Sequence, residues 1–262
     1  MIRSTLSPRS STPFRPGLPP RFRLGTLAGL LLALAGFASA QVAPQPLAMT
    51  SDLDLVGASV SYLADLDLLV FEVEVAGAAG ETVPTARGQV DGAPVLAYAF
   101  PTTLPATAVG FGAVDGVLTL AVTVHPDFDD TPLWDEDGDY DYANDGWVFH
   151  THWVVLAPDE RVAGGLSAVE FAADSGATLP PTNAGMPMYL DSPGFSVVTD
   201  GSRLRVLVPA QRVRGQTEFG FDAVAAYLQV NTSDAARPML GVYAVYDVLS
   251  GDLSLPYSVT DR

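Results

Sequence analysis

Apolar and polar residues alternate along most of the chain in short runs, which is the pattern of β-strands and not of helices. Gly, Pro, Asp or Ser residues lie close to most of these runs, as expected where strands end in turns. The predicted strands are Val56–Leu63, Leu68–Val75, Val95–Phe100, Val117–His125, Trp147–Leu156, Leu166–Ala172, Phe195–Thr199, Arg203–Val208, Val224–Val230 and Leu240–Val248.

About ten to twelve strands at this spacing predict an all-β protein. The expected architecture is a single antiparallel β-sandwich, of jelly-roll or immunoglobulin-like type, with one long acidic loop, and a barrel is the alternative. Gly and Pro are spread evenly and no linker divides the chain. We therefore expect one sandwich domain over 51–262, preceded by a short extended segment at 41–50.

The first forty residues have the features of a targeting segment. Five Arg residues lie between positions 3 and 23, an apolar run extends from Leu24 to Phe37, and Ala38-Ser39-Ala40 provides small residues for cleavage. This pattern predicts a secretory signal peptide over 1–40, cut before Gln41, with an uncleaved anchor as the alternative. The protein is expected to be exported to the periplasm or the extracellular space, with no membrane insertion after cleavage.

Charge and composition exclude several classes of function. Without the predicted signal peptide, 8 basic residues face 30 acidic ones, a formal charge of −22. Such a chain repels phosphate, so no nucleic-acid partner is expected. The chain has neither Cys nor Lys, which excludes disulfides, thiolate metal sites and a Schiff-base lysine.

The segment 125–153 is chemically unusual. It contains all three His and all three Trp residues of the chain, and nine of the 30 acidic residues lie between Asp127 and Asp145. A loop of about twenty residues, 126–146, would carry all nine carboxylates. Such long loops are uncommon unless they are functional or disordered, and so many carboxylates repel one another unless a cation neutralises them.

The acidic run from Asp135 to Asp141 has carboxylates at alternate positions around Gly138. It resembles the calcium loops of EF-hand, dockerin and thrombospondin type 3 proteins, and the resemblance implies Ca²⁺ as cofactor. The expected ligands are Asp135, Asp137, Asp139, Asp141 and Asp145. Counted from Asp137, Tyr142 and Val148 stand where an EF-hand has Gly and a bidentate Glu, so a looser calcium loop is expected. A solvated acidic loop is the alternative, although Trp134, Tyr140 and Trp147 suggest a platform for a glycan or another exported protein.

The three histidines form a second candidate metal site. His150 and His152 lie on one face of their strand, opposite Trp153, and His125 lies opposite the large apolar residues of its own strand. If the two strands pair so that His125 is diagonal to His150, the three imidazoles converge. His125, His150 and His152 would then suit Zn²⁺ or Cu²⁺. Met186 and Met188 raise a further alternative, copper handling in the periplasm.

The run Arg203–Pro209, followed by Phe219-Gly-Phe-Asp222, resembles the strand–Pro–loop–strand ending of DOMON and family 9 carbohydrate-binding-module sandwiches. That resemblance implies the sandwich fold alone. Gly-x-Ser-x-Gly, Gly-x-Gly-x-x-Gly and His-Glu-x-x-His motifs are absent, and no catalytic residue is assigned. The sequence therefore favours an exported, non-catalytic metal-binding module with calcium as the first expected ion. A zinc or copper metalloenzyme and a copper-binding protein are the alternatives.

Overall fold

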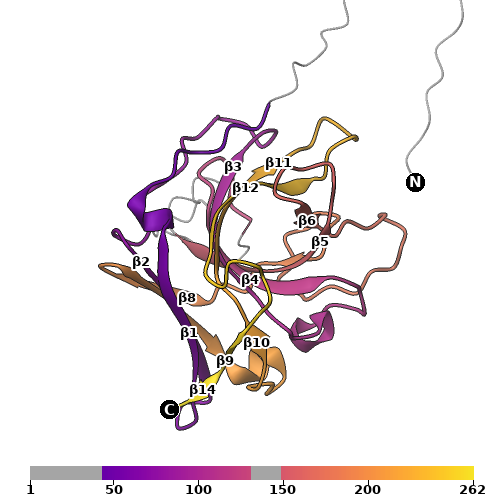
Figure 1. Ribbon diagram of the computed structural model, residues 1–262. Helices are drawn as coiled ribbons and strands as arrows, with labels where there is room; N and C mark the ends of the chain where they lie inside the picture. The colour runs from indigo at the N-terminus through magenta and orange to yellow at the C-terminus, as the bar shows by residue number, and fades with distance from the viewer. Residues whose placement is uncertain (1–42, 131–148) are drawn as a thin grey trace, which may run out of the picture. The chain divides into compact units, whose positions relative to one another are not determined.

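A computed structural model describes residues 43–130 and 149–262, which belong to one compact unit, Ser39–Arg262 (Figure 1). The all-β prediction is confirmed, because the helices in this part of the chain are three short 3₁₀ turns, η1 (Ser51–Leu53), η2 (Ala106–Val109) and η3 (Ala210–Val213). The predicted signal peptide lies outside the described residues, so cleavage and export stay predictions.

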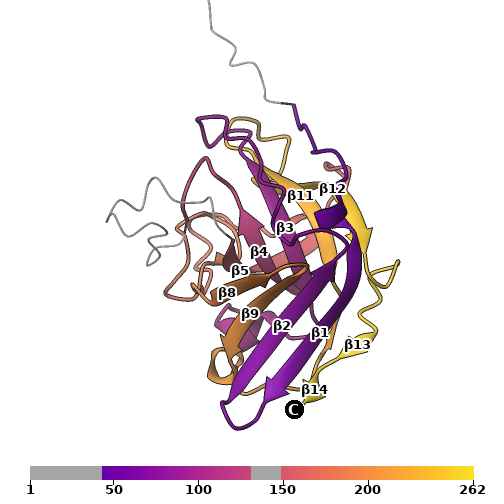
Figure 2. The ribbon, with the colours of Figure 1, turned by 90° about the vertical axis from the view of Figure 1, so that its left-hand side faces the viewer.

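Five strands form an open sheet in the order β14-β1-β2-β9-β8. Its members are β14 (Thr260–Asp261), β1 (Leu55–Leu63), β2 (Leu68–Val75), β9 (Arg203–Pro209) and β8 (Ser196–Asp200). All neighbours are antiparallel except β14, which pairs in parallel with β1. Figure 2 shows β1, β2, β9 and β8 as a layer beside the remaining strands.

A second group of six strands closes into a barrel in the order β4-β3-β11-β12-β6-β5. Its members are β4 (Val117–Val124), β3 (Pro94–Pro101), β11 (Val224–Val230), β12 (Leu240–Val248), β6 (Leu166–Ala168) and β5 (His150–Pro158). Closure occurs because β5 pairs with β6 along one edge and with β4 along the other. Short strand β7 (Leu190–Asp191) also pairs with β5. A separate two-stranded pair joins β10 (Gly220–Phe221) to β13 (Tyr257–Ser258).

This closure corrects the expectation of a single sandwich. Two layers are present, but one of them is the flank of a barrel. The sequence pattern could not show the closure of the barrel, because closure depends on β6. This strand has three residues where a longer strand, Leu166–Ala172, was expected. The strands Leu68–Val75, Val224–Val230 and Leu240–Val248 have the predicted bounds. The strand–Pro–loop–strand pattern of 203–222 is present as β9, η3 and β10.

Strand alternation produces two separate hydrophobic cores. On β3, Leu96, Tyr98 and Phe100 point outward from the barrel and pack against the open sheet. The intervening residues Val95 and Ala97 point into the barrel lumen and belong to the second core. Phe71 of β2 lies in the first core, with ring centroids 5.4 Å from Phe100 and 6.3 Å from Trp153. The barrel is therefore apolar along much of its lumen as well as on the flank that the sheet covers.

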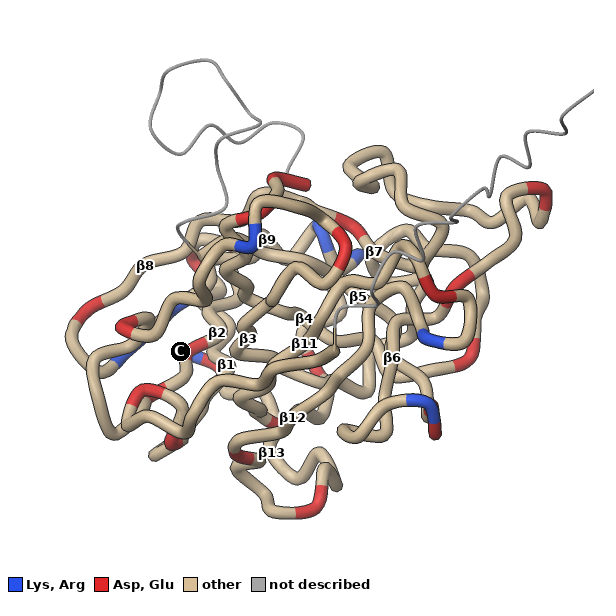
Figure 3. The backbone as a smooth tube through the Cα atoms, turned by 90° about the horizontal axis from the view of Figure 1, so that it is seen from above, with Lys and Arg blue, Asp and Glu red and all other residues tan. Residues whose placement is uncertain are grey.

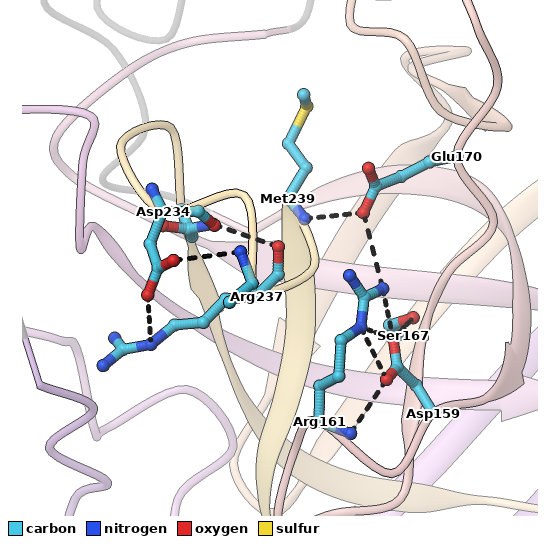
Figure 4. Close-up of polar contacts among 9 residues, drawn as sticks. Asp159, Arg161, Ser167, Glu170, Asp234, Arg237 and Met239 are labelled. Carbon is cyan, nitrogen blue, oxygen red and sulfur yellow. Dashed lines mark hydrogen bonds and ion pairs between the residues drawn. The ribbon is translucent and has the colours of Figure 1, made fainter.

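The weakest pairing of the barrel is at β6, which meets β12 through one register pair, Gly241↔Ser167. Side-chain hydrogen bonds flank β6 on both sides (Figure 4): Asp159, directly after β5, accepts from Arg161 and, at 2.7 Å, from Ser167 of β6, and Glu170, after β6, accepts one from the backbone N–H of Met239, next to β12, at 2.8 Å. The backbone N–H of Gly164 donates to the carbonyl of Val242 at 2.9 Å. A Cβ on Gly164 would lie 2.7 Å from that oxygen, so the close approach requires glycine.

Candidate metal centre

The three histidines come from the paired ends of β4 and β5. Thr123 pairs with His150 and Ala121 pairs with His152. This register is the one in which His125, the residue after β4, lies diagonal to His150, so the predicted pairing is confirmed. A shift by one residue would have turned His125 to the other face.

The histidine face is the inside of the barrel. Trp153 and Val155 on β5 point to the core shared with the open sheet, while Val154 points to the lumen. His150 and His152 therefore project into the same end of the lumen as His125. All three are buried, with exposed fractions of 2–3%. The histidines are opposite the large apolar residues, as predicted, but that face is a second interior and not a surface.

Asp130 completes the group. Its Oδ1 atom lies 3.4 Å from His125 Nε2, 3.6 Å from His150 Nε2 and 3.5 Å from His152 Nε2. One potential ligand atom from each of these four residues falls within 4.8 Å of all the others. The backbone places this carboxylate through a short turn after β4, in which Phe128 stacks on the His125 ring at a centroid distance of 4.2 Å.

Hydrogen bonds on the far side of two rings fix their orientation. His125 Nδ1 lies 2.8 Å from the carbonyl oxygen of Phe128, and His152 Nδ1 lies 3.0 Å from the hydroxyl of Ser192. A carbonyl can only accept, so His125 Nδ1 carries a proton. In neutral His125 the lone pair is then on Nε2, which faces Asp130. Metal-binding histidines are held in this way, with the second ring nitrogen bound to a carbonyl or similar group.

The electrostatics favour an ionised carboxylate. Burial opposes its charge, yet the nearby imidazoles of His152 and His125 hold the pKa of Asp130 well below its usual value. Burial also acts against a charge on His125, but Asp130 outweighs it and raises the pKa of that ring. For His152, burial prevails and lowers the pKa to about 3. The group thus combines one fixed negative charge with an imidazole that stays neutral, both suited to a cation.

Two buried atoms at the centre of the group, Asp130 Oδ1 and His152 Nε2, make no hydrogen bond to any described residue. Buried polar atoms without partners are costly. The three distances from Asp130 Oδ1 are close to the edge of about 3.4 Å that a tetrahedron has when each ligand lies about 2.1 Å from zinc. The fourth contact, His125 Nε2 to His150 Nε2, is 2.6 Å and would have to widen by about 0.8 Å.

Met186 and Met188 lie beside the histidines. They line, together with His125, Asp130 and His152, a small cavity of about 40 Å³. Met188 is fully buried within the lumen core. The two thioethers therefore belong to the surroundings of the histidine group, as the copper alternative requires.

The other predicted site residues cannot be placed. The calcium ligands Asp135, Asp137, Asp139, Asp141 and Asp145 lie outside the described residues, as do the platform residues Trp134, Tyr140 and Trp147. Within the described parts, acidic residues are distributed over many loops and greatly outnumber basic ones (Figure 3). The calcium loop and its platform remain predictions.

Sequence reasoning did not single out Asp130. It counted this residue among nine acidic ones that the sequence could not distinguish. Asp127, three residues earlier, has a different role, since its Oδ1 accepts hydrogen bonds from the backbone N–H groups of Arg87 and Gly88 at 2.5 and 2.6 Å. No spacing rule in the sequence separates these two carboxylates.

Fold and site together define an all-β protein with a three-histidine, one-aspartate group at one end of a six-stranded barrel. Comparison with protein-family models, with curated proteins and with solved structures finds no match to this chain.

Among the residues with a described structure, no helix is long and apolar enough to cross a membrane.

Proposed function

We propose that the protein binds one divalent transition-metal ion, Zn²⁺ in the first instance, through His125, His150, His152 and Asp130. The observation that carries this proposal is the convergence of four ligand atoms in which Asp130 Oδ1 and His152 Nε2 are buried without a hydrogen-bond partner among the described residues. An ion at the centre would satisfy both atoms and compensate the charge of the carboxylate.

The proposed role is structural and non-catalytic. In a tetrahedral zinc site, four protein ligands leave no position for a reactive water, whereas catalytic zinc sites keep one open. The ion would link the end of β4, the start of β5 and the turn that carries Asp130. It would thereby stabilise the end of the barrel that carries the histidines.

The first experiment is elemental analysis of full-length protein purified without a histidine tag. One zinc per chain, lost in His152→Ala and retained in Ser196→Ala on the exposed strand β8, is the expected result. Calcium bound without any transition metal would refute the histidine site and favour the loop of Asp135–Asp145. Neither ion at stoichiometric level would reject both.

Imidazole NMR gives an independent measurement, because the chain has three histidines and all three are in this group. Zinc should move the Nε2 resonances of all three rings and leave the Nδ1 of His125 protonated. The 2.6 Å contact between His125 Nε2 and His150 Nε2 requires a proton on one of the two atoms. Zinc needs the lone pairs of both atoms, so this proton must leave Nε2, and the ¹⁵N spectra should show its loss from that position when zinc binds.

Copper binding is a second candidate, supported by the position of Met186 and Met188 on the same cavity. Thioethers are soft ligands that suit Cu(I), and zinc binds them poorly. If copper is the physiological ion, Met186→Leu should weaken copper binding at least tenfold and leave zinc affinity unchanged. Equal affinity of this variant and the parent for copper would remove the candidate.

A further inference from the structure

The barrel has a second cavity, at the end away from the histidines. Its volume is about 180 Å³. For comparison, a cavity of about 150 Å³ lined by apolar side chains is large enough to bind benzene. Among the described residues that line this chamber, Thr119 alone has a polar side chain, and its hydroxyl has a partner in the carbonyl oxygen of Val117. The chamber is therefore apolar and, in size, suited to one aromatic ring with a small substituent.

Small residues on several strands keep the chamber open. Ala97 and Ala99 of β3, Ala121 of β4 and Ala226 of β11 all line it, and Ala97, Ala121 and Ala226 are buried. The alternate residues on β3 are the large Leu96, Tyr98 and Phe100. A narrow barrel is ordinarily filled by its own side chains, so alanine at these lumen positions leaves space that a guest molecule can occupy.

The mouth of the chamber is lined by exposed apolar side chains. Val117, Val245 and Leu253 are 37–40% exposed and all three line it. An apolar opening that leads to an apolar interior favours entry of an uncharged molecule, because none of the described residues that line the chamber is charged.

Two leucines at this mouth have an unusual backbone. Leu253 and Leu255 line the chamber and have φ values of 59° and 55°, a left-handed conformation that costs a residue with a side chain about 1–2 kcal/mol. The segment is held there because Ser250 Oγ accepts a hydrogen bond from the N–H of Leu253, and Ser250 itself donates to the buried Asp222. Strain of this kind is found at ligand clamps.

We propose that the barrel lumen is a binding site for a small uncharged aromatic molecule, which enters at the end of Val117 and Val245 and is covered by Leu253 and Leu255. The chamber and the histidine-end cavity share Ala121, Val154 and Leu228 as lining residues, so a guest would lie along the lumen toward the histidines. The inference depends on the chamber alone and does not require a bound metal.

The test uses toluene as probe and full-length protein with ¹³C-labelled alanine methyl groups. Toluene should shift the methyl resonances of Ala97, Ala99, Ala121 and Ala226 saturably through its ring current. The methyl of Ala225, which points to the other core, should not move and serves as the internal control. The result should be the same with zinc and with chelator, so that failure of the metal proposal and failure of this one are distinguishable.

Two variants sharpen the test. Ala97→Leu should fill the chamber and weaken toluene binding at least tenfold, while Val198→Leu on the exposed part of β8 should bind as the parent does. If Ala97→Leu does not fold, Leu253→Gly replaces it, because glycine accepts the left-handed backbone without strain. That variant should remain folded and release toluene at least tenfold faster. Absence of saturable shifts in the parent, or equal shifts at Ala225, would overturn the proposal, and an unchanged release rate in Leu253→Gly would refute the cover.

Discussion

Zinc should raise the melting temperature of the parent protein, and removal of one ligand should abolish that increase. A ligand that binds only the folded state at a free concentration of 100 times its Kd adds about 2.7 kcal/mol to stability. For a domain of 150–250 residues, each kcal/mol corresponds to about 2–4 °C in Tm. The described unit, Ser39–Arg262, falls within this size range, so the expected increase is about 5–11 °C.

The assay is differential scanning calorimetry of each protein in zinc and in chelator, with the difference between the two Tm values as the readout. This difference removes any change that a substitution makes to the metal-free fold. His152→Ala should reduce the difference to zero. Ser192→Ala should reduce it partly, because it removes the hydroxyl 3.0 Å from His152 Nδ1, and loss of such an outer contact costs about 10–100-fold in metal affinity.

Two controls make the result interpretable. Ser196→Ala, on an exposed position of β8, should show the full zinc effect. Calcium in place of zinc should change the Tm of the parent and the Tm of His152→Ala by the same amount, because neutral imidazole is a poor calcium ligand. A zinc effect of equal size in His152→Ala and in the parent would refute the site, as would no effect in the parent at any zinc concentration.

Three further predictions concern the fold. Arg161, through a side-chain hydrogen bond, lowers the pKa of Asp159, so the ionised carboxylate stabilises the folded state above about pH 4 and this contribution is lost as the pH falls further. Asp159→Asn should cost about 1–2 kcal/mol of unfolding free energy at pH 7 and should make stability, measured by urea titration, fall less steeply in acid. A fall as steep as that of the parent would contradict this. Gly164→Ala should lower the urea midpoint, because its Cβ would lie 2.7 Å from the Val242 carbonyl oxygen. Gly165→Ala is the control, because its Cβ would meet no atom within 4 Å and the variant would show only the cost of a positive φ. Phe71→Ala should cost about 3–5 kcal/mol in chemical denaturation, because it removes a ring buried between sheet and barrel, and a loss below 1 kcal/mol would refute that packing.

The strands and their facing sides were predictable because alternation is a local property. In the pairing of Thr123 with His150, the large apolar residues of both strands meet one core, a condition that restricts the possible registers to those with the correct faces but does not select one of them. What those strands could not reveal is that the opposite face is also an interior. That outcome depends on β6, a three-residue strand that pairs with β12 at a single position, and such a short pairing has no period to detect.

The site was predictable to a similar degree. The three histidines stood out because no others exist in the chain, and strand geometry brought them together. Asp130 differs from its acidic neighbours through its position in the turn that stacks Phe128 on His125. That turn is set by contacts across the barrel end, which no spacing between residues encodes.

The polarity of the lumen changes from one end to the other along the same strands. On β4 the inward positions are Val117, Thr119, Ala121 and Thr123, followed by His125, and on β5 they run from His150 to Leu156. Antiparallel pairing places both histidine ends at one end of the barrel and both apolar ends at the other. Two kinds of site, one for a cation and one for an apolar guest, then share a single interior wall at Ala121, Val154 and Leu228.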